Sequence, residues 1–450
     1  MKLVVVGAGE VGSYLSAQLS ERGHEVTVIE TNPEICRLLD EHYNVRVVNG
    51  NGSSVSVLNK AHVEKADFFM AMTRDDQTNL IASSLAKKLG AGTVITRIHD
   101  STFADTSHFN YREHFGIDIL INPEMLSAVE LAKSIRNPAR VAVENFARGQ
   151  IEAQRFEVNS KSKYVGLALR DIKLPPQVKI GYIARGEDQD VPTGNTILVA
   201  GDTLTVFGRS NDLYDLRSKI DPASTGHMRN IAILGGGEVA LALLRLLNHT
   251  RFKIRVIEKV EERCELLGNQ FPHVTFINGD GTSLRLMEEE QIGEADYFVA
   301  ATADDERNVL TSAQANKLGA KHVQAIITKS DYEDILLNMK QGLGIETIVS
   351  PRVVTAKEVM RYVSKDPYIE LFQFPHHSGR VLEIPVEAKS PAANKRLREI
   401  EWPEHAVVVA LLHEHQARVP GAEDQILAGD RVVVITRDEN IKDLLRLLRD

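Results

Sequence analysis

The sequence has few cysteines, few aromatic residues and no long hydrophobic run. Its 450 residues include two cysteines, one tryptophan and 6% aromatic residues in all. Two cysteines, with no C-x-x-C motif and no histidine/cysteine cluster beside them, indicate neither a disulfide framework nor a structural zinc site. No apolar stretch approaches the roughly 20 residues that cross a bilayer. The composition therefore argues against a disulfide-rich secreted domain and against an integral membrane protein.

Basic residues are also fewer than acidic residues. Lysine and arginine number 53 against 62 acidic residues, which gives a net charge of −9. Without a basic stripe interleaved with aromatic residues, a nucleic-acid partner is not expected. The start, Met1-Lys2-Leu3, enters an apolar strand at once and leaves no room for a signal peptide, so we expect an intracellular protein. A chain of this length should contain several domains.

The most informative feature is a glycine motif that occurs twice in register. Residues 4–12 and residues 232–240 each run from an apolar strand through a G-x-G-x-x-G/A turn into a predicted helix. A second strand follows in each copy and ends in an acid, Glu30 and then Glu258. Both features recur at the same offset of 228 residues, from 7 to 235 and from 30 to 258. One such motif is common in proteins, but two in register are not.

This motif suits a dinucleotide or an adenine nucleotide. Gly7 permits the tight turn, Gly9 lets the backbone approach a pyrophosphate, and Gly12 allows close packing of helix on strand. Free N–H groups at the helix start attract phosphate oxygens. Glu30 and Glu258 would accept hydrogen bonds from a ribose diol and disfavour a 2′-phosphate, which favours NAD(H) or an adenine nucleotide over NADP. The alternative is that the glycines serve turn geometry alone, and it is stronger for the second copy.

Strands continue to alternate with helices after each acid. Such alternation is typical of a parallel, doubly wound sheet, the Rossmann fold of the α/β class. Polar residues follow two of the strands, Asn51 and Thr73 in the first copy, with Asp280 and Thr302 at the matching places. Ligands bind α/β sheets at the carboxyl ends of strands, so these residues should face the ligand. In the first copy we expect strands at 45–48, 66–73, 93–98 and 117–121, with a long helical stretch before the last.

A different pattern follows each Rossmann unit. Short alternating strands such as 154–158 and 179–184 indicate a small α/β domain. A Gly-Asp turn before a β-branched run closes each of these domains, at Gly201 and again at Gly429. The turn-rich segment 221–227 is the best candidate for a linker between the two halves. We expect four domains, two tandem Rossmann domains each followed by a small α/β domain, at 1–123, 140–225, 228–348 and 366–450.

The ordered set of motifs resembles the RCK (regulator of potassium conductance) family. Within that family it is similar to the regulatory subunits of bacterial Trk potassium uptake, which carry two RCK units in tandem. The resemblance covers essentially the whole chain. Besides the glycine turn and Glu30, it rests on Asn49-Gly50-Asn51-Gly52, on Thr73-Arg74-Asp75-Asp76 with Asn79, on Ala200-Gly201-Asp202, and on their copies.

The resemblance implies a function and partners. The Rossmann units would bind NAD(H), with ATP or ADP as further possibilities, and the small domains would help to assemble a ring from four chains, a homotetramer. The protein would lie in the cytoplasm against the inner face of the cell membrane. Its partner would be an integral-membrane potassium transporter of the TrkH or TrkG type, which it would regulate.

The two sites are not expected to be equivalent. Arg74 and Arg97 could offset phosphate charge, whereas the second copy has Ala303 and Ile326 in their places. The first should be the stronger NAD(H) site, and the second binds a different nucleotide, binds weakly or is structural. The alternative for both arginines is solvated surface charge. We expect nucleotide contacts at Gly7, Ala8, Gly9, Glu10, Val11, Gly12, Glu30, Asn51, Thr73, Arg74, Arg97 and Ile98, and at Gly235, Gly236, Gly237, Glu238, Val239, Glu258, Asp280 and Thr302.

An NAD-dependent oxidoreductase acting on a small substrate is the main alternative. Such an enzyme needs a substrate domain with an acid or base beside the nicotinamide, and the small domains offer no evident candidate. The 15 histidines are scattered. His413 and His415 could share one strand face, but a metal site needs three or more convergent ligands. We therefore predict a regulatory protein with neither a catalytic nor a metal site.

Overall fold

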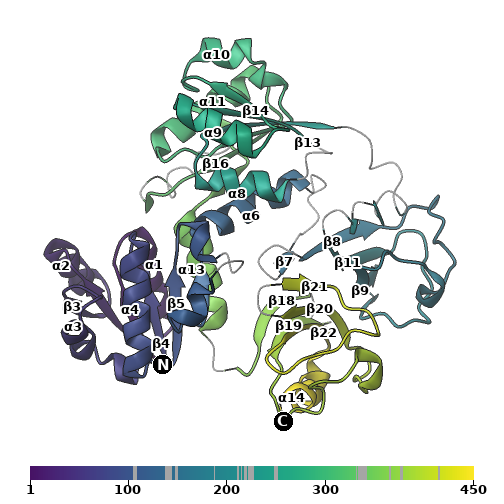
Figure 1. Cartoon of the computed structure of the whole chain (residues 1–450). Helices are drawn as coiled ribbons and strands as arrows, with labels where there is room; N and C mark the ends of the chain where they lie inside the picture. Colours follow the sequence, from purple (N-terminus) through teal and green to yellow (C-terminus); the bar gives the residue numbers. More distant parts are fainter. Residues whose placement is uncertain are drawn as a thin grey trace. The chain divides into compact units, whose positions relative to one another are not determined.

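The computed structural model divides the chain into two compact units (Figure 1). The first unit joins Met1–Ala132 to Met228–Val363, and the second joins Lys133–His227 to Ser364–Asp450, so each contains segments from both halves of the sequence. The expected linker 221–227 lies outside the residues that the structure describes. The described residues are 1–104, 109–136, 144–146, 151–186, 188–209, 212–213, 215–216, 220, 228–247, 252–330, 332, 342–363, 366–374, 379–413 and 416–449.

The first Rossmann domain is built on a six-stranded parallel sheet with the order β3-β2-β1-β4-β5-β6. This order reverses between β1 and β4, so the crevice opens at the turn after β1. The doubly wound sheet predicted from the sequence is confirmed. Its strands are β1 Lys2–Val6, β2 Glu25–Glu30, β3 Arg46–Asn49, β4 Phe68–Ala71, β5 Thr93–Arg97 and β6 Ile119–Ile121, and its helices are α1 Glu10–Glu21, α2 Pro33–His42, α3 Val55–Lys60, α4 Asp76–Leu89, α5 Tyr111–His114 and α6 Pro123–Arg136.

The second Rossmann domain repeats this architecture. Its sheet is again parallel and has the order β14-β13-β12-β15-β16-β17. The strands are β12 Arg229–Leu234, β13 Phe252–Glu258, β14 Thr275–Asn278, β15 Tyr297–Ala300, β16 His322–Ile326 and β17 Thr347–Val349, and the helices are α8 Glu238–Leu246, α9 Glu261–Gln270, α10 Leu284–Glu289, α11 Asp305–Leu318 and α13 Pro351–Tyr362.

Both faces of the first sheet are buried, which explains the apolar sequence of its central strands. Along β1, Val5 enters one core cluster together with Leu15 of α1, whereas Val4 and Val6 enter another together with Phe69 of β4. Successive side chains of a strand point to opposite faces, so one continuous apolar run serves both clusters. The central strand that carries the glycine turn is thereby fixed from both sides.

Helix α13 comes from the second half of the chain but packs against the first Rossmann domain (Figure 1). Ala356 and Val359 of α13 are fully buried in the same cluster as Leu15 of α1. The Arg352 guanidinium lies 4.9 Å from the ring centroid of Tyr14, also in α1. The helix that begins at the first glycine turn is therefore held partly by the other half of the sequence.

The second unit consists of two five-stranded antiparallel sheets, ordered β10-β9-β11-β8-β7 and β18-β19-β22-β20-β21. One core cluster contains residues of both sheets, and Tyr182 stacks on Phe374 with ring centroids 3.8 Å apart. The strands are β7 Glu144–Phe146, β8 Ile151–Glu157, β9 Val178–Arg185, β10 Asp188–Asp190, β11 Thr203–Gly208, β18 Ile369–Gln373, β19 Arg380–Pro385, β20 Val407–His413, β21 Gln416–Arg418 and β22 Arg431–Thr436, followed by helix α14 Ile441–Leu448.

One expectation about secondary structure is wrong. Between β5 and β6 the described residues form a 3-10 turn, Ser101–Ala104, and a one-turn helix, Tyr111–His114, in place of a long helical stretch. The short helix begins where the Asn110 side chain accepts a hydrogen bond from the Glu113 N–H, and Gly116, with φ of +65°, follows its end. Within the described ranges, no helix has both the length and the apolar character needed to cross a membrane.

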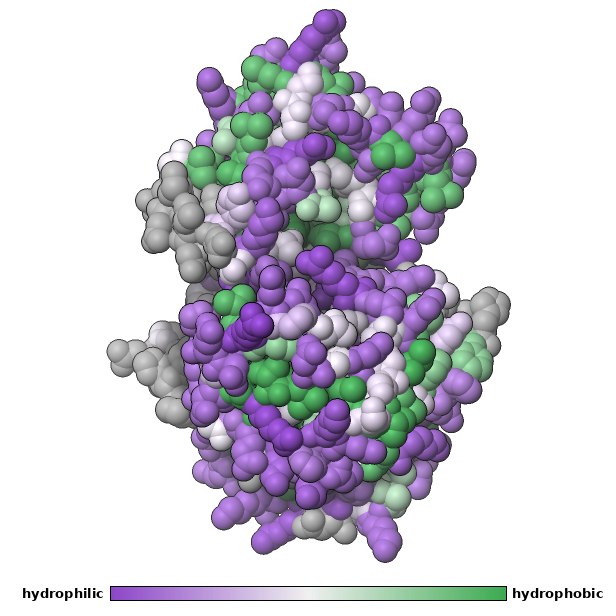
Figure 2. All heavy atoms as spheres, turned by 90° about the vertical axis from the view of Figure 1, so that its left-hand side faces the viewer, coloured by the Kyte–Doolittle hydropathy of each residue, from purple (hydrophilic) through white to green (hydrophobic). Residues whose placement is uncertain are grey.

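The face drawn in Figure 2 is mainly hydrophilic, with groups of hydrophobic residues on it. Among the exposed large side chains, Ile81 in α4 and Leu310 in α11 occupy matching positions of the two Rossmann domains. They are 46% and 53% exposed. The repeat therefore leaves the same helix position of each domain apolar and open to solvent.

Candidate functional site

The first glycine turn leaves the start of α1 open. Gly7 has φ of +90°, and a Cβ there would lie 2.9 Å from the Thr73 side chain, so only glycine suits this position. At Gly9, by contrast, a Cβ would meet nothing within 4 Å. Gly9 is the N-cap residue of α1, and no side chain caps this helix in the described part of the chain. N–H groups at an uncapped helix start attract anions.

Glu30 links the end of β2 to the glycine turn. Its Oε2 accepts a hydrogen bond from the Ala8 N–H at 2.7 Å, and its Oε1 accepts hydrogen bonds from the N–H groups of Thr31 and Asn32. Burial raises the pKa of Glu30, but the hydrogen bonds from Asn32, Ala8 and Thr31 outweigh it and hold the pKa below its ordinary value. The carboxylate is therefore charged and shapes the turn that it faces.

The end of β4 is tied to the end of β5 by Asn79. The Asn79 Oδ1 accepts hydrogen bonds from the Thr73 N–H and hydroxyl, and its Nδ2 donates to the carbonyls of Thr73 and Arg97. Asn51 lies in an exposed turn after β3, where its Oδ1 accepts a hydrogen bond from the Ser53 N–H. Asn51 and Thr73 thus follow the carboxyl ends of two strands, as the sequence predicted.

Arg74 and Arg97 line one open cavity of about 540 Å³ beyond Thr73. Arg74 is exposed. The Arg97 side chain is mostly buried, its Nε has no hydrogen-bond partner among the described residues, and burial lowers the pKa of its guanidinium. The structure thus brings together the two arginines that the sequence singled out. His99, Phe103 and the carboxylates of Asp75, Asp76 and Asp100 also line the cavity.

Three of the expected contact residues have buried or closely packed positions. The side chains of Val11 and Ile98 belong to hydrophobic clusters, and the Ile98 N–H donates to the Ile121 carbonyl. The expected contact of Ile98 with the nucleotide stays a prediction, although its side chain is packed and its N–H is already bonded. Gly12 acts through packing, since a Cβ there would lie 1.9 Å from the Gly7 carbonyl oxygen. The Glu10 side chain lies half-buried in the first turn of α1.

The second glycine turn has the same backbone plan. Gly235 has φ of +94°, and Gly237 is the N-cap residue of α8, which likewise has no side-chain cap within the described chain. Glu258 Oε2 accepts a hydrogen bond from the Gly236 N–H at 2.7 Å, as Glu30 does from Ala8. Thr302 is bonded to Asn308 as Thr73 is to Asn79. At the start of α8, Glu238 is exposed and Val239 is half-buried.

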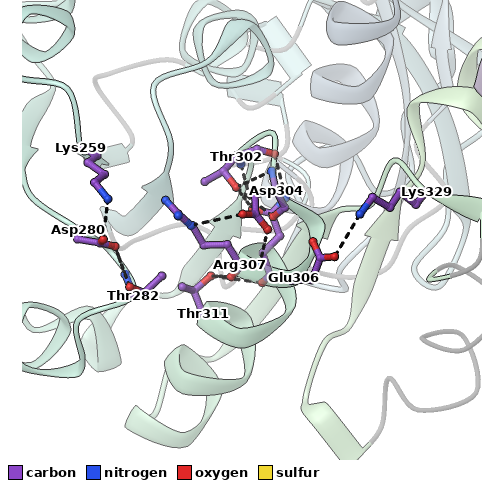
Figure 3. A network of polar contacts seen from close by, with 10 residues as sticks. Lys259, Asp280, Thr282, Thr302, Asp304, Glu306, Arg307, Thr311 and Lys329 are labelled. Carbon is purple, nitrogen blue, oxygen red and sulfur yellow. Dashed lines mark hydrogen bonds and ion pairs between the residues drawn. The ribbon is translucent and has the colours of Figure 1, made fainter.

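The charges around the second turn differ from those around the first. Arg263 Nε donates to the Gly236 carbonyl at 2.6 Å. Figure 3 shows Lys259 paired with Asp280, with a distance of 3.0 Å between Nζ and Oδ2. Hydrogen bonds from Thr282, followed by the one from Lys259, hold the pKa of Asp280 well below its usual range. Two further cations, Arg307 and Lys329, also have acidic partners, Asp304 and Glu306.

These cations are functional candidates that the sequence reasoning missed. Alignment of the two copies would have found them, because Lys259, Arg263 and Lys329 replace Thr31, Ile35 and Asp100 of the first copy. The second site lacks the two arginines of the first, but it does not lack positive charge. In the first site the arginines face an open cavity, whereas in the second each cation named here is held by a carboxylate or a carbonyl.

The histidine pairs give no metal site in the part of the chain that the structure describes. His413 Nδ1 lies 2.6 Å from Asp430 Oδ1, and Arg185 makes the matching contact to Asp202 in the first small domain. Both acids are buried and also accept a backbone N–H. This contact is therefore structural in both copies. His415 lies outside the described residues.

Two domain families match the chain twice each. The TrkA-N domain matches residues 3–123 and 231–351, and the TrkA-C domain matches residues 153–221 and 381–449. The chain belongs to the TrkA family. The tandem arrangement inferred from the repeated motifs is thereby confirmed.

Relatives in the TrkA family are similar along the whole chain. A Trk system potassium uptake protein TrkA homolog of Archaeoglobus fulgidus is 31% identical over 450 residues, and the alignment covers 100% of both chains. A second TrkA homolog, from Methanosarcina mazei, is 30% identical over 462 residues with the same coverage. The Trk system potassium uptake protein TrkA of Halomonas elongata is 26% identical, with 100% of this chain and 99% of that protein covered.

Solved RCK structures share the fold of this TrkA-family chain. The GsuK RCK domain has a TM-score of 0.58 at 17% identity, with 99% of this chain and 94% of that chain covered. The GsuK channel bound to NAD gives a TM-score of 0.58 at 18% identity, with 99% and 78% covered. The RCK resemblance drawn from the sequence is confirmed at the level of fold.

Proposed function

We propose that this TrkA-family chain is a nucleotide-binding regulatory subunit of a membrane potassium-uptake transporter of the Trk type. One observation carries the proposal. In each Rossmann domain a glycine turn, a helix start without a side-chain cap and an acid at the end of the next strand lie together. Potassium uptake is named in the relatives that match this chain over its full length.

The residues of the first site fit NAD(H) or an adenine nucleotide. The open space at Gly9 leaves room for a pyrophosphate against the start of α1. Glu30 would accept hydrogen bonds from the ribose, exchanging part of its bonding to the backbone for the diol. Asn51 and Thr73 would contact the remainder of the ligand. The GsuK structures bound to NAD and to ADP support the choice of ligand class.

The second site is proposed to bind more weakly or to prefer another nucleotide. Its Arg263 bonds to the glycine turn and its Lys259 bonds to Asp280, so a ligand must displace or share these contacts. The remaining candidate contacts, Glu258 and Thr302, keep the geometry of the first site. The four-domain division at 1–123, 140–225, 228–348 and 366–450 belongs to the same proposal, and the doubled TrkA-N and TrkA-C matches support it.

The proposed assembly is a homotetramer on the cytoplasmic face of the membrane, bound to a transporter of the TrkH or TrkG type. One observation supports self-association. Ile81 and Leu310 leave matching apolar positions exposed on α4 and α11. Equivalent exposed positions on repeated domains suit contacts between equivalent copies.

The chain is proposed to act without catalysis, in contrast to a dehydrogenase. The relatives that match this chain over its full length are named for potassium uptake, which supports a regulatory role over that of a dehydrogenase. A nucleotide that binds two conformations of an assembly with unequal affinity shifts the equilibrium between them. A shift of about 1–3 kcal/mol per site is typical, and it suffices for regulation.

An NADH titration followed by fluorescence tests the proposal. We expect saturable binding that ATP displaces, that Glu30→Ala abolishes and that Glu258→Ala weakens little. Glu34→Ala, an exposed glutamate in α2, is the matched control and should bind as the wild type does. Absence of binding by the wild type, or loss of NADH absorbance on addition of small carbonyl substrates, would contradict a non-catalytic sensor.

A further inference from the structure

We propose that the first small domain docks on an anionic lipid surface through four exposed apolar side chains and the lysines beside them. The four side chains, called here the apolar patch, are Val165, Leu167, Ile197 and Val199. Each of them is between 36% and 52% exposed. The inference rests on the proposed location at the membrane and adds the part of the chain that meets the lipid.

The apolar patch is formed by two segments that pair with each other. The Gly166 N–H donates to the Leu198 carbonyl at 2.8 Å, and the Leu198 N–H donates to the Leu167 carbonyl at 3.0 Å. Ala168 and Ile197 form an antiparallel bridge. Residues 165–168 and 197–199 therefore lie next to each other. Their exposed apolar side chains gather in one place, whereas single exposed apolar residues are common on any protein surface.

The segments of the patch cover the face of the sheet that points away from the second small domain. Tyr182 and Phe207 of this sheet enter the core cluster shared with the sheet of the second small domain. Val206, on the other face of β11, enters a separate cluster with Tyr164 and Leu198. The patch is thus outside the contact between the two small domains, and that contact does not cover it.

The second small domain has the same backbone pairing with a different surface. Its Asn394 N–H donates to the Ile426 carbonyl, and the Ile426 N–H donates to the Lys395 carbonyl. At the four positions of the patch it has Ala393, Lys395, Gln425 and Leu427. The fold therefore does not require apolar side chains at these places. Their exposure in the first copy indicates a contact outside the domain.

Three exposed lysines accompany the patch, namely Lys161, Lys163 and Lys173. None of them forms an ion pair with another residue in the described part of the chain. Between residues 159 and 175 the sequence has one acid, Asp171, whose carboxylate lies 4.0 Å from Arg170 Nε. This acid offsets the arginine and leaves the three lysines as open positive charge beside the apolar side chains.

The second small domain has less open positive charge. At the positions of two of the lysines it has Pro391 and Glu401. Its Arg396 and Arg398 both pair with Glu423. Exposed apolar side chains and unpaired cations thus occur together in the first copy and are reduced together in the second.

An anionic lipid surface fits this combination. The chain carries a net charge of −9, so its attraction to such a surface must be local. Lysines are attracted to anionic headgroups, and apolar side chains enter the boundary between headgroups and acyl chains.

The turns of the patch project into open space. Gly166 and Gly201 have φ of +84° and +87°, and a Cβ at either would meet nothing within 4 Å. Side chains on projecting turns can enter a fluid surface, whereas a protein partner would need a recess that matches them. The geometry therefore favours lipid over a protein partner.

Co-sedimentation of the full-length chain with lipid vesicles tests the proposal. One set of vesicles contains equal parts of phosphatidylcholine and phosphatidylglycerol, and the other contains phosphatidylcholine alone. We expect the chain to bind the anionic vesicles about tenfold or more tightly than the neutral ones, because lysines contribute only at a charged surface. Added salt should weaken the binding to the anionic vesicles.

Two double variants separate the apolar contribution from that of charge. Leu167→Gln/Ile197→Gln should fold, because the second copy has polar residues at both positions. Its affinity for anionic vesicles should fall about tenfold or more, since the apolar contact is lost while the lysines remain. Lys161→Gln/Lys163→Gln should lower the same affinity by about fivefold for each lysine.

The matched control is Leu427→Gln. Leu427 stands in the second small domain at the position of Val199 and is 37% exposed, like Val199 itself. This variant should bind both kinds of vesicle as the wild type does. All of these variants should also bind NADH as the wild type does, which separates the lipid contact from the nucleotide sites.

Three results would overturn the lipid contact. They are absence of wild-type binding to anionic vesicles, equal binding to both kinds of vesicle, and undiminished binding by Leu167→Gln/Ile197→Gln. A change in the oligomeric state of that variant without vesicles would likewise overturn it and assign the patch to a second copy of the chain. Failure of the wild type to bind NADH while its vesicle binding is intact would refute the proposed function and support the lipid contact alone.

Discussion

At the scale of single residues, Glu30 has two roles, because it supports the glycine turn and is also the proposed contact for the ribose. Its carboxylate accepts hydrogen bonds from three backbone N–H groups and so holds the glycine turn in place before any ligand arrives. A glutamine at this position would place its amide N–H₂, which is itself a donor, against some of these backbone N–H groups and would leave them without an acceptor. The residue therefore supports the turn as well as the proposed ribose contact.

The effect of Glu30 on stability should depend on pH. Because its pKa is lower in the folded chain than the ordinary 4.5, the carboxylate stabilises the fold fully above that value, and the stabilisation is lost as pH falls through the depressed folded pKa. We expect Glu30→Gln to reduce the free energy of unfolding by about 2 kcal/mol at pH 7 and by progressively less in acid. Thermal melts from pH 7 to pH 3 measure this, with the exposed Glu34→Gln as control; equal melting of wild type and Glu30→Gln at pH 7 would contradict it.

At the scale of elements, the strand–turn–helix unit was the most predictable part of the molecule. Local steric requirements determine this unit, because the tight turn needs glycine at Gly7 and close packing of helix on strand needs a small residue at Gly12. Strand geometry favours Arg97 over Ile98 as a contact of the ligand, and the contact of Ile98 stays a prediction. Arg97 and Ile98 are neighbours, and neighbouring side chains at a strand end point to opposite faces, so a cavity that takes one excludes the other.

The second and third glycines of the turn, Gly9 and Gly12, should separate folding from binding. Gly9→Val adds a side chain in open space, so we expect the fold to persist and nucleotide binding to fall at least tenfold. Gly12→Val places a Cβ against the Gly7 carbonyl oxygen, and we expect a loss of about 3 kcal/mol or more in the free energy of unfolding. Melting curves and NADH titrations of both variants check this, and wild-type affinity in a folded Gly9→Val variant would refute the site.

At the scale of the whole molecule, the sequence reveals the duplication but not that a helix of the second half, α13, packs on the first Rossmann domain. The packing of α13 on α1 joins residues more than 300 positions apart, and no local pattern encodes such a contact. The same holds for the cations of the second site. Lys259 and Arg263 can be read from the sequence, but their pairing with Asp280 and with the glycine turn follows from tertiary structure.

The contact of α13 with α1 predicts that a destabilising change in α13 also destabilises α1. Val359→Ala removes two methyl groups from a fully buried position and should cost about 1–2 kcal/mol. Hydrogen exchange of the α1 amides should accelerate although α1 lies in the other half of the sequence. Val55→Ala, at an exposed position, is the control. Unchanged α1 exchange in a destabilised Val359→Ala variant would show that the contact carries no stabilisation.

The most direct test of the account is potassium flux through a Trk-type transporter reconstituted in vesicles with this chain, measured with and without NADH or ATP. The account predicts that nucleotide changes the flux with the wild-type chain, that Gly9→Val removes this response while the chain remains folded, and that the nucleotide is recovered unchanged. A flux that is indifferent to nucleotide, or a response that Gly9→Val leaves intact, would contradict it.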